Sequence, residues 1–216
     1  SCSVFAGNPY FIDLDLLARD GLLRRKDYAF LQWGGDPSRV DYGTLYERRF
    51  AVLRKAYANF LKRRPLPGYE TPYSDDWYRF QFLSADWLPD YCLYMAIKED
   101  NGMIDWQQWP RELPRRGPAA AARFRADHAR AIEFWAFVQY EFYRQWEALH
   151  NYAASKGVSI MGDIPIYVAP DSADAWAGPE LFETDEDGRP RRVAGCPPDY
   201  FAVDGQLWGN PIYDWD

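Results

Sequence analysis

Residues 158–168 are the most strand-like run of this chain, whose other periodic segments have helical spacing. The run is rich in apolar residues and is interrupted by Gly162-Asp163 and by Pro165. A central parallel strand tolerates nearly continuous hydrophobicity, and a carboxylate at its C-terminal end is typical of α/β barrels. The pattern therefore predicts one β-α-type unit embedded in helices, too few for the eight units of a whole barrel.

Helices are predicted from the hydrophobic period and from capping residues. Asp13 or Asp15 can cap a short first helix that closes near Gly21, and Gly157 stands where glycine commonly ends a helix. Amphipathic or mostly buried helices are predicted between them, over residues 41–60, over 77–97 and from Pro118 onward.

The composition limits the class of partner. The 216 residues carry a net charge of −7 and no dense Lys/Arg tract, which argues against a nucleic-acid surface. No window approaches about twenty uninterrupted apolar residues, and the first residues have no signal-peptide pattern. We therefore expect a cytoplasmic protein without a nucleic-acid or membrane partner, whose ligand is neutral or cationic.

The three cysteines, Cys2, Cys92 and Cys196, are widely spaced and odd in number. They indicate neither a disulfide framework nor a metal-ligand cluster, and we expect structural thiols in a reducing compartment. The acidic segment 185–188 has the pattern of an Asx-Gly turn and lacks the twelve-residue pattern of a calcium loop. No metal and no cofactor are expected.

A loop at residues 195–210 has the composition of a carbohydrate-binding surface. Two prolines stiffen its start, and aromatic residues alternate with amide and carboxylate groups after them. Sugar rings present apolar C–H faces and hydroxyl edges, which such a surface complements. The candidate binding residues are Asp199, Tyr200, Phe201, Gln206, Trp208 and Asn210. For any single aromatic residue, packing in the core is the alternative.

Asp163 is the only carboxylate within the apolar run. Because burial of an unpaired carboxylate costs on the order of several kcal/mol, this residue either caps a turn or pairs with an arginine, or it contacts a substrate hydroxyl or a catalytic group. Residues 171–174 have the pattern of a helix cap. The two histidines, His128 and His150, lie in or near the long helix, and no Ser or Cys pattern supports a hydrolase triad.

Seven ordered segments resemble the amylomaltases, the 4-α-glucanotransferases of the α-amylase superfamily. They extend over nearly the whole chain and comprise residues 3–10, 40–46, 162–168, 171–176, 185–190, 195–201 and 205–211. The resemblance implies an α/β fold, a partial (β/α)8 TIM barrel with large helical insertions, of which this chain is a helix-rich fragment. Early barrel elements and a helical insertion subdomain would occupy residues 1–156, and a barrel strand with the aromatic substrate-binding loop would occupy residues 157–216.

The resemblance also implies roles for individual residues. Asp163 matches an aspartate of the subsite beside the cleaved bond, and Tyr200 and Phe201 match an aromatic loop that covers the bound glucan. Trp208 lies in the same substrate-facing region, and Tyr46 matches a tyrosine of a secondary glucan site. The implied partners are α-1,4-glucans and maltooligosaccharides.

The family's nucleophilic aspartate, acid/base glutamate and stabilising aspartate occur in sequence contexts that are absent here. A retaining mechanism needs two carboxyl groups about 5 Å apart, which Asp163 alone cannot supply. No catalytic residue is therefore assigned, and the catalytic carboxylates are expected beyond Asp216. We expect an inactive internal fragment of a 4-α-glucanotransferase that transfers α-1,4-glucan segments by retaining double displacement; the alternative is a non-catalytic α-glucan-binding module. The sequence leaves the oligomeric state open.

Overall fold

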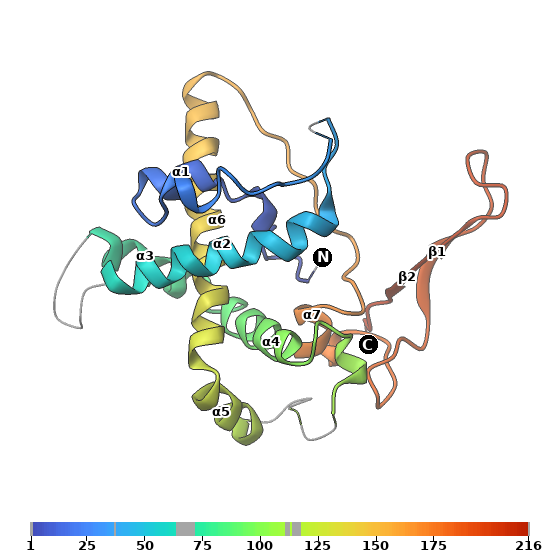
Figure 1. The fold of residues 1–216 in the computed structure, drawn as a ribbon. Coiled ribbons are helices and arrows are strands. Elements are labelled where there is room, and N and C mark those ends of the chain that lie inside the picture. Colours follow the sequence, from blue (N-terminus) through green and yellow to red (C-terminus); the bar gives the residue numbers. More distant parts are fainter. Residues whose placement is uncertain (1, 37, 64–71, 111–112, 114–117, 216) are drawn as a thin grey trace. The chain divides into compact units, whose positions relative to one another are not determined.

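The structure, a computed structural model, describes residues 2–36, 38–63, 72–110, 113 and 118–215. Helices make up most of its regular structure (Figure 1). The α-helices are α1 (Leu14–Arg19), α2 (Tyr42–Arg63), α3 (Pro72–Leu83), α4 (Leu88–Asp100), α5 (Pro118–Asp127), α6 (Ala129–Ser155) and α7 (Ala173–Ala177). The remaining elements are the 3-10 helices η1 (Pro9–Phe11), η2 (Arg25–Asp27), η3 (Trp106–Gln108) and η4 (Pro179–Leu181), and the strands β1 (Val193–Cys196) and β2 (Gln206–Pro211).

The chain divides into two compact units, each assembled from separate segments. The helical unit comprises residues 7–85 and 134–160. The sheet unit comprises residues 1–6, 86–133 and 161–216. The boundary predicted between residues 156 and 157 separates two parts of an expected barrel rather than two compact units, and it stays a prediction.

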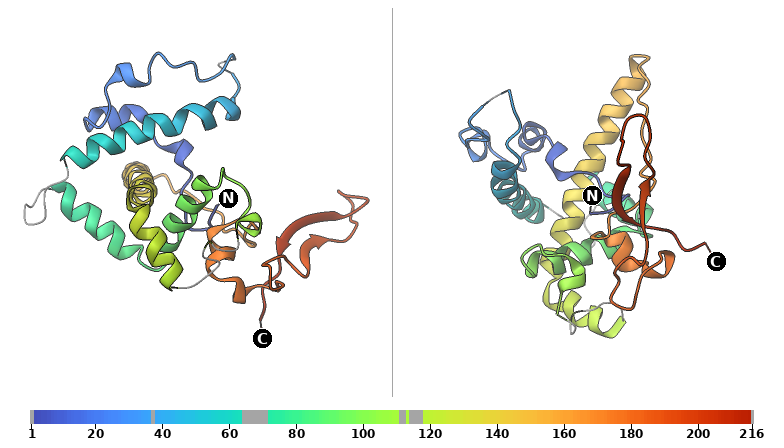
Figure 2. Two further views of the ribbon diagram at one scale, coloured as in Figure 1. Left: turned by 60° about the horizontal axis from the view of Figure 1, so that its bottom comes forward. Right: turned by 90° about the vertical axis from the view of Figure 1, so that its right-hand side faces the viewer.

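Aromatic residues form the core of the helical unit. Helices α2 and α3 pack against α6 there (Figure 2), with ring centroids 5.0 Å apart for Phe60 and Phe137 and 5.4 Å apart for Trp77 and Tyr140. All four side chains are buried. The helix predicted over residues 41–60 is confirmed as α2, whose apolar face enters this core.

The loop from Gly7 to Asp13 is attached to α6 by two glutamine side chains. Gln139 bonds both backbone groups of Gly7, and Gln145 bonds both backbone groups of Asp13. Asp13 is then the N-cap of α1, because its Oδ1 accepts hydrogen bonds from the N–H groups of Asp15 and Leu16. The predicted first helix is thereby confirmed.

The sheet unit contains the two strands of the described chain, which pair antiparallel as a hairpin. Gly195 opposes Leu207, and the register shifts between Val193 and Gly195. A Cβ at Gly195 would lie 2.4 Å from the carbonyl oxygen of Gln206, so glycine is required for this close approach. The base of the hairpin adjoins a small core of Val168, Ala175 and Phe182.

The long helix predicted from Pro118 is two helices, α5 and α6, separated at His128. Its predicted end is confirmed. Gly157 has a φ of +72° and donates to the carbonyl of Ala154, while Val158 donates to that of Ala153. These two bonds form a Schellman motif, in which glycine takes the left-handed conformation without steric cost.

Two sequence-based predictions were wrong. Residues 158–168 contain no strand, because a strand needs a neighbour to pair with, and the β1–β2 hairpin is the only sheet among the described residues. Residues 77–97 were expected to be mostly buried, but this holds only for α4. On α3, Phe82 and Leu83 are exposed.

Candidate functional site

The tip of the β1–β2 hairpin presents two adjacent aromatic side chains. Tyr200 is 95% and Phe201 92% exposed, and their rings meet edge to face at 5.6 Å. Asp199 shapes this tip, since its Oδ1 accepts from the N–H groups of Phe201 at 2.8 Å and Ala202 at 2.7 Å. The carboxylate of Asp199 is therefore engaged in the turn, while both rings project into solvent.

Trp208 lies on β2 and is half exposed. Its indole Nε1 donates to Oε1 of Gln206 at 2.9 Å, so these two predicted site residues are directly bonded. The Trp208 ring also contacts that of Tyr167, with centroids 6.1 Å apart. Tyr167 was not among the predicted site residues, although it stands in the segment that resembles the amylomaltases.

A stack of rings connects Trp208 to the interior of the sheet unit. Tyr167 lies nearly parallel to Tyr213, with ring centroids 6.2 Å apart and planes 17° apart. Tyr213 in turn packs against the core that contains Val168 and Phe182. The Trp208 ring is therefore connected to the small core of the sheet unit through Tyr167 and Tyr213.

Asn210 is half-buried, and its Nδ2 donates to the carbonyl oxygen of Val168 at 2.7 Å. This bond joins β2 to the end of the segment that was predicted to be a strand. At least one donor of the amide is thus used within the protein.

Asp163 is exposed, and its Oδ1 accepts from the N–H of its neighbour Ile164 at 2.9 Å. The expectation that this carboxylate is buried was wrong, because the surrounding run is not in a sheet. Its apolar neighbours are exposed too: Met161 by 97%, Ile164 by 82% and Ile166 by 75%. The role of Asp163 at a substrate subsite stays a prediction.

The predicted site residues are distributed over both units. Gln206, Trp208 and Asn210 lie together on β2, while Asp199, Tyr200 and Phe201 occupy the hairpin tip. Tyr46 belongs to the helical unit, on α2, where its side chain is 49% exposed.

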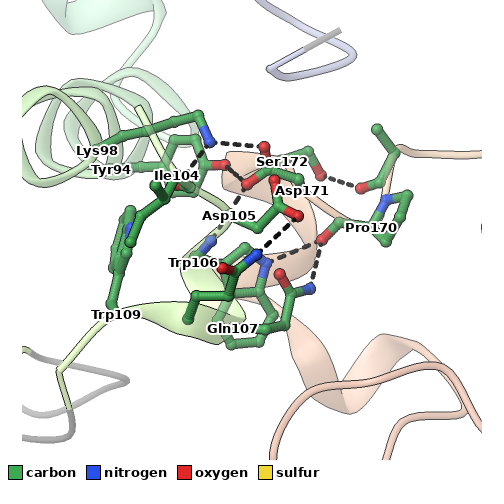
Figure 3. Close-up of polar contacts among 12 residues, drawn as sticks. Tyr94, Lys98, Ile104, Asp105, Trp106, Gln107, Trp109, Pro170, Asp171 and Ser172 are labelled. Atoms are coloured by element: carbon green, nitrogen blue, oxygen red, sulfur yellow. Dashed lines mark hydrogen bonds and ion pairs between the residues drawn. The ribbon is translucent and has the colours of Figure 1, made fainter. Parts of the chain in front are cut away.

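A half-buried polar network holds residues 170–172, which follow the segment that carries Asp163 and Tyr167, as Figure 3 shows. Asp171 accepts hydrogen bonds from Nζ of Lys98 at 2.6 Å, from the hydroxyl of Tyr94 at 2.6 Å and from the N–H of Trp106 at 3.3 Å. Lys98 is buried, and it also donates to the carbonyl of Ile104.

The ionisation of Asp171 follows from these contacts. Partial burial acts to raise the pKa of its carboxyl group, but the hydrogen bonds from Lys98 and Tyr94 outweigh this effect and hold the pKa below its usual range. The pKa of the Tyr94 hydroxyl is raised, by burial first and then by its bond to Asp171. Asp171 is therefore ionised, and it forms an ion pair with the buried side chain of Lys98.

The two neighbours of Asp171, Pro170 and Ser172, also form hydrogen bonds. The carbonyl of Pro170 accepts from Nε1 of Trp106 at 2.9 Å and from Nε2 of Gln107 at 3.0 Å. Ser172 is the N-cap of α7, since its Oγ accepts from the N–H of Ala175. The cap predicted at residues 171–174 is confirmed with Ser172 as the capping residue.

The sequence analysis did not predict the Lys98–Asp171 ion pair. Its one signal in the sequence is Lys98 itself, a charged residue that directly follows the apolar run 91–97.

Other chemistry has little support in the described part of the chain. No group of three His, Cys, Asp or Glu side chains there could hold a metal ion. None of the helices described is long and apolar enough to cross a membrane. The three cysteines are free thiols.

Comparison with known proteins identifies the relatives of this chain. The family model described as 4-alpha-glucanotransferase matches residues 1–216. A 4-alpha-glucanotransferase of Thermus thermophilus is 45% identical over 216 residues, and one of Clostridium butyricum is 41% identical over 218 residues. Both matches cover 100% of this chain, but only 41% and 42% of the respective relatives.

A solved structure agrees with this result. The amylomaltase from Streptococcus agalactiae in complex with acarbose matches with a TM-score of 0.91 and 43% sequence identity. The match covers 100% of this chain and 42% of that one. The helix-rich arrangement described above is therefore an arrangement that an amylomaltase adopts over part of its length. The chain belongs to the 4-alpha-glucanotransferase family.

Proposed function

We propose that this chain forms a glucan-facing part of a 4-α-glucanotransferase that transfers α-1,4-glucan segments between maltooligosaccharides by retaining double displacement. The observation that carries the proposal is the pair of almost fully exposed rings at the hairpin tip, Tyr200 and Phe201, in a chain of this family. Substrates of the maltodextrin and glycogen type fit these rings, because α-1,4-linked glucose presents C–H faces for stacking.

Each candidate side chain has a task in this proposal. Tyr200 and Phe201 cover the glucan and exclude water from the reacting bond, which favours transfer over hydrolysis. Trp208 offers a second stacking face, with Gln206 at its edge. The exposed carboxylate of Asp163 accepts hydrogen bonds from sugar hydroxyls, and Tyr46 contributes to a second glucan site.

The carboxylates that make and break the glycosidic bond are not assigned to this chain. A retaining mechanism needs two of them about 5 Å apart, one as nucleophile and one as acid/base. In the proposal, this chain is part of a (β/α)8 barrel with large helical insertions, which the rest of the protein completes. The exposure of Met161, Ile164 and Ile166 supports this view, because contiguous apolar side chains call for a covering surface.

A cytoplasmic location is part of the proposal. It is supported by the three free thiols, which are typical of a reducing compartment.

The test is transfer by the complete gene product. Incubated with maltotriose, it should release glucose and form longer maltooligosaccharides, with little net increase in reducing ends. The 216-residue chain alone should give no turnover. If the complete product binds maltooligosaccharides saturably but neither transfers nor hydrolyses them, the transferase proposal fails, and a non-catalytic glucan-binding module is the correct description.

A further inference from the structure

Val168 connects the candidate site to the small buried core of the sheet unit. Its side chain is buried, and its carbonyl oxygen accepts the hydrogen bond from Asn210. Two and three residues later, the carbonyl of Pro170 accepts from Nε1 of Trp106, and the carboxylate of Asp171 accepts from Nζ of Lys98. The chain is thus held on both sides of Ala169, whose own carbonyl accepts from the hydroxyl of Ser172.

The residue directly before Val168 is Tyr167, and its ring contacts Trp208. Trp208 stands two residues before Asn210 on the same strand. The Asn210–Val168 bond therefore ties together the two backbone segments that carry the stacked rings. If the bond is lost, strand β2 can move relative to residue 167, and the face of Trp208 moves with it.

We propose that Asn210 is a positioning residue, which acts on the bound glucan through the Tyr167–Trp208 ring pair. This inference rests on the proposed function, because it takes Trp208 as a stacking face for α-glucan. It changes the predicted role of Asn210 from a direct ligand to a residue that aligns a ligand. The amide is suited to this task, since its Nδ2 donates to the Val168 carbonyl oxygen across 42 residues of sequence.

A stacking face contributes about equally to the bound ground state and the transition state. Misalignment of Trp208 should therefore raise KM while kcat changes little. A role confined to stability would instead lower the melting temperature and leave both constants of the folded enzyme unchanged. The split between KM and kcat separates the two roles.

Asn59 provides a matched control. Its Nδ2 donates to the carbonyl of Leu22 at 2.9 Å, across 37 residues, whereas the Asn210 bond spans 42 residues. Asn59 belongs to the helical unit, whereas Trp208 and Asn210 belong to the sheet unit. Asn59→Ala and Asn210→Ala thus each remove one amide-to-carbonyl hydrogen bond between segments that are distant in sequence. Only Asn210→Ala removes such a bond next to the Tyr167–Trp208 ring pair.

The experiment uses the complete gene product with maltotriose, comparing N210A, N210D and N59A. N210D keeps the shape of the side chain and loses the donor, so it serves if N210A fails to fold. We expect KM to rise about fivefold or more in N210A and N210D, with kcat within about twofold, and no change in N59A. Asn210→Gln, which keeps an amide donor, should restore part of the loss.

A second readout needs no sugar. In protein labelled with 5-fluorotryptophan, the ¹⁹F resonance of Trp208, assigned by its absence in W208F, should shift in N210A and N210D but not in N59A. An unshifted resonance, or an unchanged KM in active N210D, overturns the positioning role. If the wild-type product transfers no glucan, the proposed function fails, and the ¹⁹F shift alone still decides whether Asn210 aligns Trp208.

Discussion

The side-chain amide of Gln139 pairs with the backbone of Gly7 in the way that one strand pairs with another. Its Oε1 accepts from the Gly7 N–H at 2.8 Å, and its Nε2 donates to the Gly7 carbonyl at 3.0 Å. Gln139 is fully buried on α6 and Gly7 is half-buried, so both bonds are largely shielded from bulk water. This pair fixes where the N-terminal loop begins its course along the helix.

Replacement of Gln139 by Leu should destabilise the chain by about 2–3 kcal/mol, because it leaves two backbone groups of Gly7 without their partners. Urea unfolding followed by tryptophan fluorescence measures the change. Gln145→Leu is the control: it removes the same pair of bonds from Asp13, whose exposed backbone water can solvate, and should cost about 1 kcal/mol or less. Equal losses in the two variants would contradict this reasoning.

Gly7→Ala should be destabilising for a different reason. A Cβ at this position would lie 1.9 Å from Cδ1 of Phe142, so the ring or the loop must move. Overpacking of this kind costs about 1–3 kcal/mol. In a double-mutant cycle, Phe142→Ala should relieve most of the effect of Gly7→Ala. Additive losses would show that the ring is not the obstacle.

The Lys98–Asp171 pair predicts a defined dependence of stability on pH. The folded-state pKa of Asp171 is lowered, so the pair stabilises the protein above the unfolded pKa of about 3.9 and loses this effect as pH falls through the folded pKa. Asp171→Asn should therefore be less stable than wild type by about 2 kcal/mol at neutral pH. The difference should shrink as pH falls below about 4.

Lys98→Met tests the same pair from the other side. It removes the cation that lowers the pKa of Asp171, so its difference from wild type should narrow over the same acid range. The free energy of unfolding, measured from pH 7 down to pH 3 for all three proteins, gives both curves. A gap that stays constant with pH in both variants would show that the ionised pair is not the stabilising element.

The aromatic tip should govern the outcome of the reaction rather than the stability of the fold. Because Tyr200 and Phe201 are almost fully exposed, replacing both by Ala should change the free energy of unfolding by no more than about 0.5 kcal/mol. In the complete gene product, the ratio of transfer to hydrolysis should fall, since water then reaches the covalent intermediate. Product analysis with maltotriose measures this ratio, and an unchanged ratio would show that Tyr200 and Phe201 do not exclude water from the reaction.

Local signals predicted the parts of the fold that local physics decides. The amphipathic period of α2, Gly157 as the residue that ends α6 and an N-cap at Asp13 or Asp15 depend on neighbours in sequence. All three predictions are confirmed, with Asp13 as the cap. Residues 158–168 failed because a strand exists only where another strand pairs with it, which no local pattern guarantees. The same failure explains why Asp163 is exposed.

The candidate site was only partly predictable. The aromatic residues of the hairpin were identified by composition and by resemblance, and their exposure agrees with a ligand-facing role. The contacts that organise them were missed, because Asn210–Val168 and Lys98–Asp171 join residues 42 and 73 positions apart. Such pairings arise from tertiary packing, and no local sequence pattern reveals which distant carbonyl an amide will reach.

The two units interrupt each other along the chain, which has a consequence for engineering. The chain passes from one unit to the other between residues 6 and 7, 85 and 86, 133 and 134, and 160 and 161. A chimaera with a relative joined at a single point would therefore combine foreign halves within at least one unit. Recombination that respects the packing must exchange residues 7–85 together with 134–160, as one module carried by two inserts.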